Sequence, residues 1–260
     1  MISPEKDPSG IEIVETLAEL QFDYIELSLS HLTSMDEAAF SKLARRIERS
    51  GIACEACNNF VPARIRLTGP DADLGSALEY AKAALDRAGR LGARTIVFGS
   101  SGAKNVPAGF PHDQAWRQIV QFLQALGPLA APYGITIAIE PLNRQESNIV
   151  TLAAEGLRLS RDVGHPNIQL LIDFYHLRRE NEDFGILLEA KSAIRHVHFA
   201  EVRSRIFPID DDDDYQTFFD YLQKIGYDGR CSIEAYTKNF GSEAPRALAM
   251  LKAIASRSKK

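Results

Sequence analysis

Short apolar runs alternate with segments of helical spacing along the chain, and this alternation limits the folds that are available. Between the runs, in segments such as 74–92 and 113–127, apolar residues recur every three or four positions, as on one face of a helix. The apolar runs lie at 22–30, 52–60, 93–100, 135–142, 168–176, 194–201 and 231–236. Strands that alternate with helices at intervals of about 30 residues form parallel βα units. The sequence therefore predicts an α/β fold with a parallel sheet.

The number and order of these runs favour a (β/α)8 TIM barrel. No Pro- or Ser-rich linker divides the 260 residues, so we expect a single domain over 1–260. A complete barrel has eight strands, whereas seven runs are visible and the first expected element is a helix at 10–21. The barrel is therefore expected to lack its first strand, which either lies upstream or is absent. A doubly wound sheet is the alternative, but no GxGxxG or GxxxxGK[ST] turn follows any run.

Charge and composition argue against several classes of protein. The net charge of −5 disfavours a nucleic-acid or anionic-membrane surface as the partner. No apolar run approaches the ~18 residues that a membrane span needs, and the N-terminal residues do not resemble a signal peptide. We therefore expect a cytoplasmic protein. Cys54 and Cys57 lie in one expected strand, on opposite faces, and are interpreted as packing residues.

Four consecutive runs end in a side chain that can bind a metal ion. These residues are Glu140, Asp173, His198 and Glu234, each about 30 residues, or roughly one βα unit, from the next. The carboxyl ends of barrel strands form the face that carries the active site in barrel enzymes. The two-residue period of each run places all four side chains inward, with the intervening isoleucines toward the helices.

Three carboxylates that converge without a cation would repel one another and raise one another's pKa values. One divalent metal ion removes that cost, and three carboxylates with one imidazole suit Mn²⁺, Mg²⁺ or Co²⁺. Any one of these residues could simply be an inward polar side chain, but the four together indicate a metal site. Asn58 ends the run at 52–60 and could reach a substrate, although it also suits a turn. His196, one layer below His198, is expected to be buried and hydrogen-bonded.

Four motifs carry a resemblance to a known family. They read "EPLNRQESN" at 140–148, "DFYH" at 173–176, "HVHFAE" at 196–201 and "IGYDG…SIEAY" at 225–236. In this order and spacing they resemble the sugar isomerase/epimerase family of xylose-isomerase-like TIM barrels, which includes ketose 3-epimerases and hydroxypyruvate isomerases. The resemblance implies that the same four strand-end residues hold the metal. It also implies that Glu146 and His176 bind the substrate.

The segment after "HVHFAE" departs from the pattern of the ketose 3-epimerases. Where those enzymes have an Asn-Arg pair and a Gly-rich loop, this chain has Ser204 at the arginine position, with Arg203 and Arg205 on either side. Either arginine is expected to hold a distal oxygen or a phosphate of the substrate. Five aspartates at 210–214 replace the glycines and are interpreted as a solvated loop and N-cap for a helix from about Tyr215.

The resemblance implies an isomerase or epimerase that removes a proton next to a carbonyl, with a metal ion stabilising the enediolate. Glu140 and Glu234 are the expected acid–base carboxylates, one on each face of the substrate. The substrate class implied is a sugar, a sugar phosphate or a keto acid. A homo-oligomer is possible by analogy.

Other readings of the same residues remain open. A lyase on the same scaffold, such as an inosose-type dehydratase or a C-glycoside-cleaving subunit, begins with the same proton abstraction. A non-catalytic relic is suggested by the absent first strand and the aspartate loop, but the full ligand set argues against it. An endonuclease IV-like repair enzyme is disfavoured, because it needs three zinc ions, more histidines than the six present and a basic groove, whereas the net charge is −5.

Overall fold

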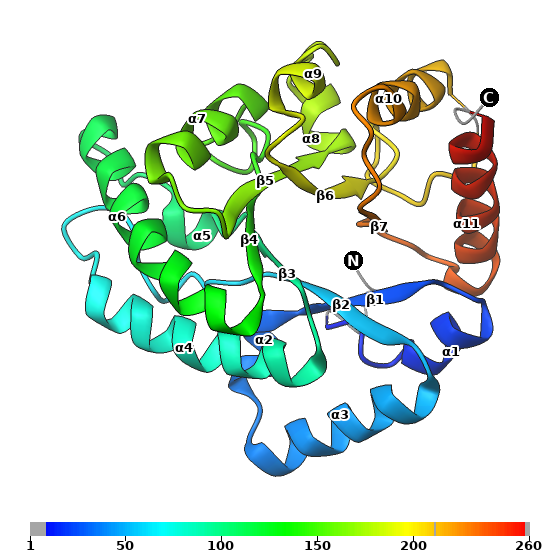
Figure 1. Ribbon diagram of the computed structural model, residues 1–260, viewed down its shortest axis with the longest axis horizontal. Coiled ribbons are helices and arrows are strands. Elements are labelled where there is room, and N and C mark those ends of the chain that lie inside the picture. The colour runs from blue at the N-terminus through cyan, green and yellow to red at the C-terminus, as the bar shows by residue number, and fades with distance from the viewer. Residues whose placement is uncertain (1–8, 211, 258–260) are drawn as a thin grey trace.

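The computed structural model describes residues 9–210 and 212–257, and its centre is one parallel sheet. The strands follow the chain in the order β1 to β7, and each pairs with the next in parallel. They are β1 (Tyr24–Ser28), β2 (Ala53–Asn58), β3 (Thr95–Phe98), β4 (Thr136–Ile139), β5 (Ile168–Asp173), β6 (Ile194–Phe199) and β7 (Arg230–Ile233). The sheet curls into a nearly closed barrel, which confirms the expected seven-stranded TIM-barrel fold (Figure 1).

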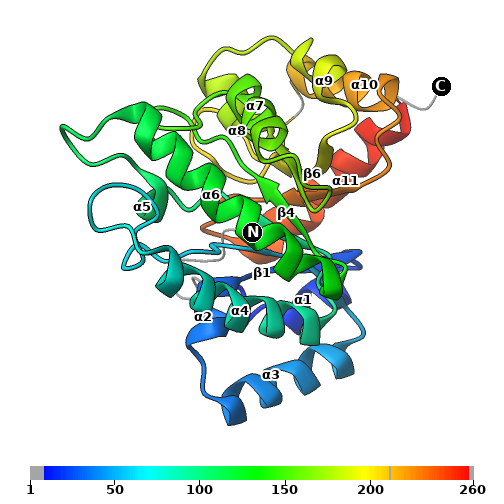
Figure 2. The same cartoon turned by 60° about the vertical axis from the view of Figure 1, so that its left-hand side comes forward.

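Most of the helices form a ring outside the strands (Figure 1). They are α1 (Val14–Glu19), α2 (Leu29–Ser34), α3 (Glu37–Ser50), α4 (Leu74–Leu91), α5 (Ser101–Lys104), α6 (His112–Ala130), the 3-10 helix η1 (Ala131–Tyr133), α7 (Ala153–Val163), α8 (Phe174–Arg179), α9 (Ile186–Ala190), α10 (Asp213–Lys224) and α11 (Phe240–Arg257). Figure 2 shows α4 and α6 packed side by side on one flank. None of the helices in the described part of the chain is long and apolar enough to cross a membrane.

The aspartates at 210–214 begin a helix, as the sequence predicted. The side chain of Asp212 accepts a hydrogen bond from the backbone N–H of Asp214, which is the interaction that stabilises a helix N-terminus. The helix begins at Asp213, two residues before the expected start. Asp210 is exposed, as a solvated loop requires, and Asp211 lies outside the described residues.

The core divides along the inner and outer faces of the strands. Ile137 and Ile139 of β4 belong to the large outer core between strands and helices. Val97, Ala138 and Leu171 form a separate small cluster. Because Ala138 and Leu171 are two residues before Glu140 and Asp173, they lie on the same face of their strands as these carboxylates. The inner cluster therefore forms a small apolar layer below the polar strand ends.

The barrel is open along one seam. β1 and β7 are the two edge strands, and within the described residues no backbone ladder joins them. An apolar cavity of about 230 Å³, lined in part by Leu17, Phe22 and Leu251, lies at this seam. Side chains bridge the seam instead of a strand: the hydroxyl of Tyr24 lies 2.6 Å from Oγ of Ser232. Arg230 of β7 stacks over the ring of Tyr24.

The pairing of β1 with β2 contains a bulge. Ile25 pairs with Cys54, but Glu26 pairs with Ala56, so one residue of β2 has no partner in the ladder. Cys54 and Cys57 are buried and free, which confirms that they are packing residues. Both belong to the outer core and pair with Ile25 and Leu27, which share one face of β1, so the expectation that they face opposite sides of the strand is wrong. The bulge is the physical reason, because it removes the regular alternation of faces.

The buried lysine of α5 makes the stability of the fold depend on pH. Lys104 is 1% exposed, and its Nζ donates a hydrogen bond to the carbonyl of Gly99 at 2.6 Å. Burial lowers the pKa of Lys104 to about 7, although the carboxylates of Glu140 and Glu146 act in the opposite direction. Above pH 7 the folded protein therefore holds a neutral lysine, whereas the unfolded chain keeps the proton until about pH 10.4.

We predict that the free energy of unfolding rises with pH because of Lys104. The unfolded state binds one more proton than the folded state in this range, so raising the pH from 7 to 9 should stabilise the protein by about 2 kcal/mol. Urea unfolding at both pH values measures this gain. In Lys104→Met the gain should disappear. An equal gain in both proteins would show that the lysine keeps its proton when folded.

Candidate active site

The four residues at the strand ends meet in one buried cluster. Asp173 is the last residue of β5 and His198 lies near the end of β6, while Glu140 and Glu234 directly follow β4 and β7. One ligand atom from each residue lies within 4.8 Å of the others, and all four side chains are buried. His198 is central: its Nδ1 lies 3.0 Å from Oε1 of Glu140 and 3.4 Å from Oε2 of Glu234.

The donor set of this cluster fits a divalent metal ion. Oδ2 of Asp173 is buried and makes no hydrogen bond, because the guanidinium of Arg205, at 3.7 Å, is too far away to donate one. An oxygen of this kind can bind a metal ion without losing a partner. Burial raises the pKa of Asp173 to about 6, and burial together with the charge of Glu234 raises the pKa of Glu140. Burial opposes ionisation of Glu234 as well, but His198 and Arg205 hold its pKa well below the usual range. A divalent ion bound by these oxygens and Nδ1 of His198 would lower all three carboxylate pKa values.

One arginine of the two candidates reaches the cluster. Arg205 has a left-handed backbone with φ of 53°, and its side chain lies over the ring of Tyr175. Its guanidinium contacts Glu234 at 2.5 Å and both carboxylate oxygens of Glu146 at 3.2 Å. Arg203 is exposed, and its backbone N–H donates to Glu201. The structure therefore brings Arg205 into the site and leaves Arg203 outside it.

His176 is held in one tautomer beside the cluster. The backbone N–H of Asn143 donates to Nδ1 of His176 at 3.1 Å, so this nitrogen carries no proton. The remaining proton is on Nε2, which lies 3.5 Å from Oδ2 of Asp173 and 3.5 Å from the guanidinium of Arg205. Asn143 also donates to Glu146 at 3.0 Å and so connects the two residues.

A cavity of about 430 Å³ opens directly beside the cluster. Its lining includes Asn58, Glu140, Glu146, Arg205 and Glu234, together with Ser30, Ser101 and Tyr236. Asn58 donates to Oε1 of Glu234 at 3.3 Å, so it contacts the cluster as well as the cavity. All of the residues proposed from the sequence, with the exception of Arg203, thus lie at this one site.

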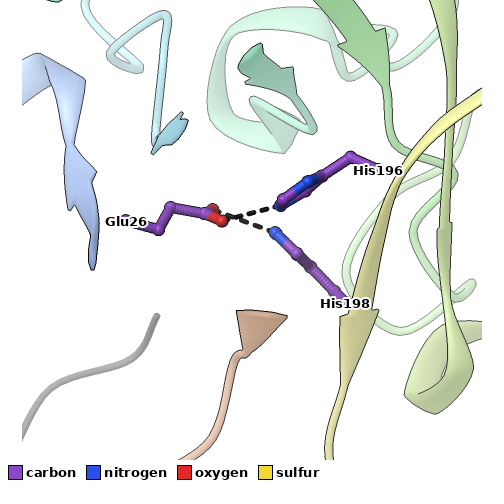
Figure 3. A group of neighbouring side chains, drawn as sticks. All are labelled: Glu26, His196 and His198. Atoms are coloured by element: carbon purple, nitrogen blue, oxygen red, sulfur yellow. Dashed lines mark hydrogen bonds and ion pairs between the residues drawn. The ribbon is translucent and has the colours of Figure 1, made fainter. Parts of the chain in front are cut away.

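Glu26 is a residue of the site that the sequence analysis did not single out. It extends from β1 toward β6, and its carboxylate faces the rings of both His196 and His198 (Figure 3). His196 is buried and hydrogen-bonded, as expected from its position one layer below His198. The signal for Glu26 was present in the run at 22–30, where a single glutamate lies between Ile25 and Leu27 on the inward face.

Comparisons with known proteins agree with this geometry. A family model described as xylose isomerase-like TIM barrel matches residues 14–255. The chain belongs to the xylose isomerase-like TIM-barrel family. An L-ribulose 3-epimerase of Mesorhizobium japonicum is 29% identical over 244 residues, with 89% of this chain and 78% of that protein covered. A D-psicose 3-epimerase of Agrobacterium fabrum is 26% identical, with 88% and 80% covered.

Solved structures show the same fold. The crystal structure of a D-allulose 3-epimerase from Methylomonas sp. with D-allulose has a TM-score of 0.84 at 23% identity and covers 94% of this chain and 90% of that chain. The relatives named by these comparisons are sugar epimerases, which indicates an enzyme that acts on carbohydrates.

Gly99 provides a test of Glu140 as a ligand. A Cβ at this position would overlap Oε2 of Glu140, so Gly99→Ala should push the carboxylate away from the cluster. We expect the dissociation constant for Mn²⁺, measured by calorimetry, to rise by about tenfold or more. Gly241→Ala is the matched control, because a Cβ there meets nothing within 4 Å. Equal Mn²⁺ affinity in both variants would contradict a ligand role for Glu140.

Proposed function

We propose that the protein is a metal-dependent ketose epimerase or isomerase that moves a proton at a carbon next to the carbonyl. The observation that carries the proposal is the pair of carboxylates that approach the same imidazole nitrogen: Glu140 from β4 and Glu234 from β7 lie 3.0 and 3.4 Å from Nδ1 of His198. Epimerisation needs an acid–base group on each face of the reacting carbon, because a proton leaves one face and returns on the other, whereas isomerisation moves the proton to the neighbouring carbon.

The ligand assignment follows from the same cluster. Glu140, Asp173, His198 and Glu234 would hold one divalent ion, with Mn²⁺, Mg²⁺ and Co²⁺ as the candidates. When bound, the ion supplies a Lewis acid that polarises the carbonyl of the substrate. Proton transfer and positioning of the substrate would be performed by side chains of the protein.

The two acid–base residues differ in their surroundings. Oε1 of Glu140 faces His198, while Oε2 lies beside Gly99 at the wall of the cavity. Oε2 is therefore the atom that would take the proton from the substrate. Glu234 is held at both oxygens, by Asn58 on Oε1 and by Arg205 on Oε2. It would pass a proton from solvent to the substrate, on the other face of the same carbon in an epimerase and at the neighbouring carbon in an isomerase.

Two further residues, Arg205 and His176, would position the substrate. Arg205 spans Glu146 and Glu234, so its guanidinium is fixed next to the acid–base pair. His176 directs Nε2–H toward the same place, because Asn143 occupies its other nitrogen. Donors fixed in this way can hold the oxygens next to the reacting carbon without reorganising.

The charges of the cavity favour a neutral ketose over a sugar phosphate or a keto acid. Among the described residues that line the cavity, Arg205 is the only cation, and it already pairs with Glu146 and Glu234. Three carboxylates line the same space. A phosphate with nearly two negative charges would lack a free partner and would be repelled by these groups. D-psicose and L-ribulose, the sugars in the names of the relatives, are neutral ketoses.

Proton exchange in D₂O, followed by NMR, tests the proposal. The protein is treated with EDTA, reloaded with Mn²⁺ or Mg²⁺, and incubated with D-psicose, L-ribulose, their phosphates and hydroxypyruvate. We expect deuterium next to the carbonyl of a neutral ketose, at least tenfold faster than in the phosphates, and no exchange with EDTA present. Loss of water or cleavage of the substrate would favour a lyase instead. No exchange with any compound would contradict the proposal.

The same measurement on Glu140→Gln and Glu234→Gln shows which carboxylate acts on which face of the substrate. Each variant should lose epimerisation by about 10³-fold, since general acid–base groups contribute 10²–10⁴-fold. Any residual exchange should occur with one epimer in the first variant and with the other epimer in the second. Glu189→Gln, at an exposed ion pair with Arg161, is the control. Turnover above about a tenth of the wild-type rate in either site variant would exclude its assigned role.

The different positions of Arg203 and Arg205 predict different effects of substituting them. Arg205→Lys removes the fork that contacts Glu146 and Glu234 together, and lysine cannot replace such a geometry. We expect kcat/KM for the ketose to fall by about 10- to 100-fold, because one or two hydrogen bonds to a charged group are lost. Arg203→Lys, on the exposed side, should retain the wild-type value. The reverse order would assign substrate binding to Arg203.

A further inference from the structure

We propose that Glu26 is a positioning residue of the metal site, which holds the imidazole of His198 so that Nδ1 faces the metal-binding carboxylates. The proposal rests on the metal site of the proposed function, but it concerns a residue outside the ligand set. Glu26 belongs to β1, on the far side of the open seam from β7, and its side chain crosses the interior of the barrel (Figure 3).

The contacts of the Glu26 carboxylate define which nitrogen of His198 is available. Oε1 of Glu26 lies 2.9 Å from Nε2 of His198, and both side chains are fully or almost fully buried. A carboxylate can only accept hydrogen bonds, so Nε2 carries a proton. By the same rule Nδ1 also carries one, beside the carboxylate of Glu140 at 3.0 Å, and a bound metal ion would replace this proton and take the lone pair of Nδ1. This is the nitrogen that lies between Glu140 and Glu234.

The second oxygen of Glu26 fixes the carboxylate itself. Oε2 lies 2.9 Å from Nε2 of His196 and accepts a hydrogen bond from Oγ of Ser232 at 2.6 Å. Both oxygens therefore have partners, and the carboxylate cannot rotate without losing one of them. Metal-binding histidines usually donate their other N–H to such a group, which orients the ring and makes it a better ligand.

Glu26, His196 and His198 are also close enough together to hold an ion of their own. Two observations favour the positioning role. Both oxygens of Glu26 are already hydrogen-bonded, whereas Oδ2 of Asp173 in the neighbouring cluster has no hydrogen bond. In addition, the two groups share His198, and a neutral imidazole offers one lone pair, so it can be a ligand in only one of them.

The same network also closes the seam of the barrel, and this second role must be separated from the first. Tyr24 and Glu26 of β1 both contact Ser232 of β7, where no backbone ladder joins the two strands. The phenol of Tyr24 touches Ser232 at 2.6 Å and has no contact with His198. Tyr24→Phe therefore removes a seam contact and leaves the bond from Glu26 to His198 in place.

The experiment compares Mn²⁺ binding by wild type, Glu26→Gln and Tyr24→Phe, measured by calorimetry on metal-free protein. A glutamine presents one acceptor and one donor, so it cannot accept from His196 and His198 together. We expect the dissociation constant to rise 10- to 100-fold in Glu26→Gln, with an unchanged circular dichroism spectrum. It should stay within about threefold of wild type in Tyr24→Phe. The visible spectrum of the Co²⁺-loaded protein should change in Glu26→Gln alone.

The outcomes are distinct. Equal Mn²⁺ affinity in wild type and Glu26→Gln would overturn the proposal. Equally weakened Mn²⁺ binding in Glu26→Gln and Tyr24→Phe would overturn it as well, because it would show that Glu26 acts only by closing the seam. Two bound ions in wild type, with only one lost in Glu26→Gln, would overturn it in favour of a second metal site. A wild-type protein that binds no Mn²⁺ would instead contradict the proposed function. If Glu26→Gln does not fold, Glu26→Asp, which keeps the charge but shortens the reach, should still weaken binding measurably, and wild-type affinity there would overturn the proposal.

Discussion

The buried imidazole of His198 is the centre on which the rest of the site depends. It lies between Glu26 on one side and Glu140 with Glu234 on the other. Burial opposes its protonation, but the surrounding carboxylates hold the pKa of His198 well above the usual range. Buried carboxylates of this number are stable only with positive charge among them. Without an ion, Arg205 and a protonated His198 supply this charge from the protein. A divalent ion bound by Nδ1 of His198 and Oδ2 of Asp173 would replace the proton of the imidazolium and supply the charge instead.

The barrel brings these charges together by repeating one arrangement around the sheet. Each parallel strand points its carboxyl end at the same face, so the last inward side chain of β4, β5, β6 and β7 reaches the common cluster. Within the described residues the sheet has seven strands, and its open seam leaves this half of the barrel undisturbed because the seam lies between β7 and β1. It does change what β1 must do. Without a ladder to β7, the interior contacts of Tyr24 and Glu26 join the two edges.

The part of the site that could be predicted from the sequence is the part that depends on local periodicity. Glu140, Asp173, His198 and Glu234 each stand at the end of an apolar run, and the two-residue period assigns their face. Glu26 was missed because it lies in mid-strand and its partner His198 is 172 residues away. The choice of Arg205 over Arg203 depends on a left-handed backbone, which few residues other than glycine adopt and which no local pattern indicates. The bulge in β2 escaped prediction for a similar reason, because its cause is the register of two strands.

The position of Arg205 connects the charge balance of the cluster to the choice of substrate. Its guanidinium contacts Glu234 and Glu146, so carboxylates of the protein already neutralise its charge before any substrate binds. A substrate that brought its own negative charge would have to displace one of these carboxylates, which would then lie buried and unpaired. A neutral polyol leaves every ion pair in place and adds only hydrogen bonds to groups such as His176 and Asn58. In the proposed function, the carboxylates that would hold the metal ion therefore also favour an uncharged sugar.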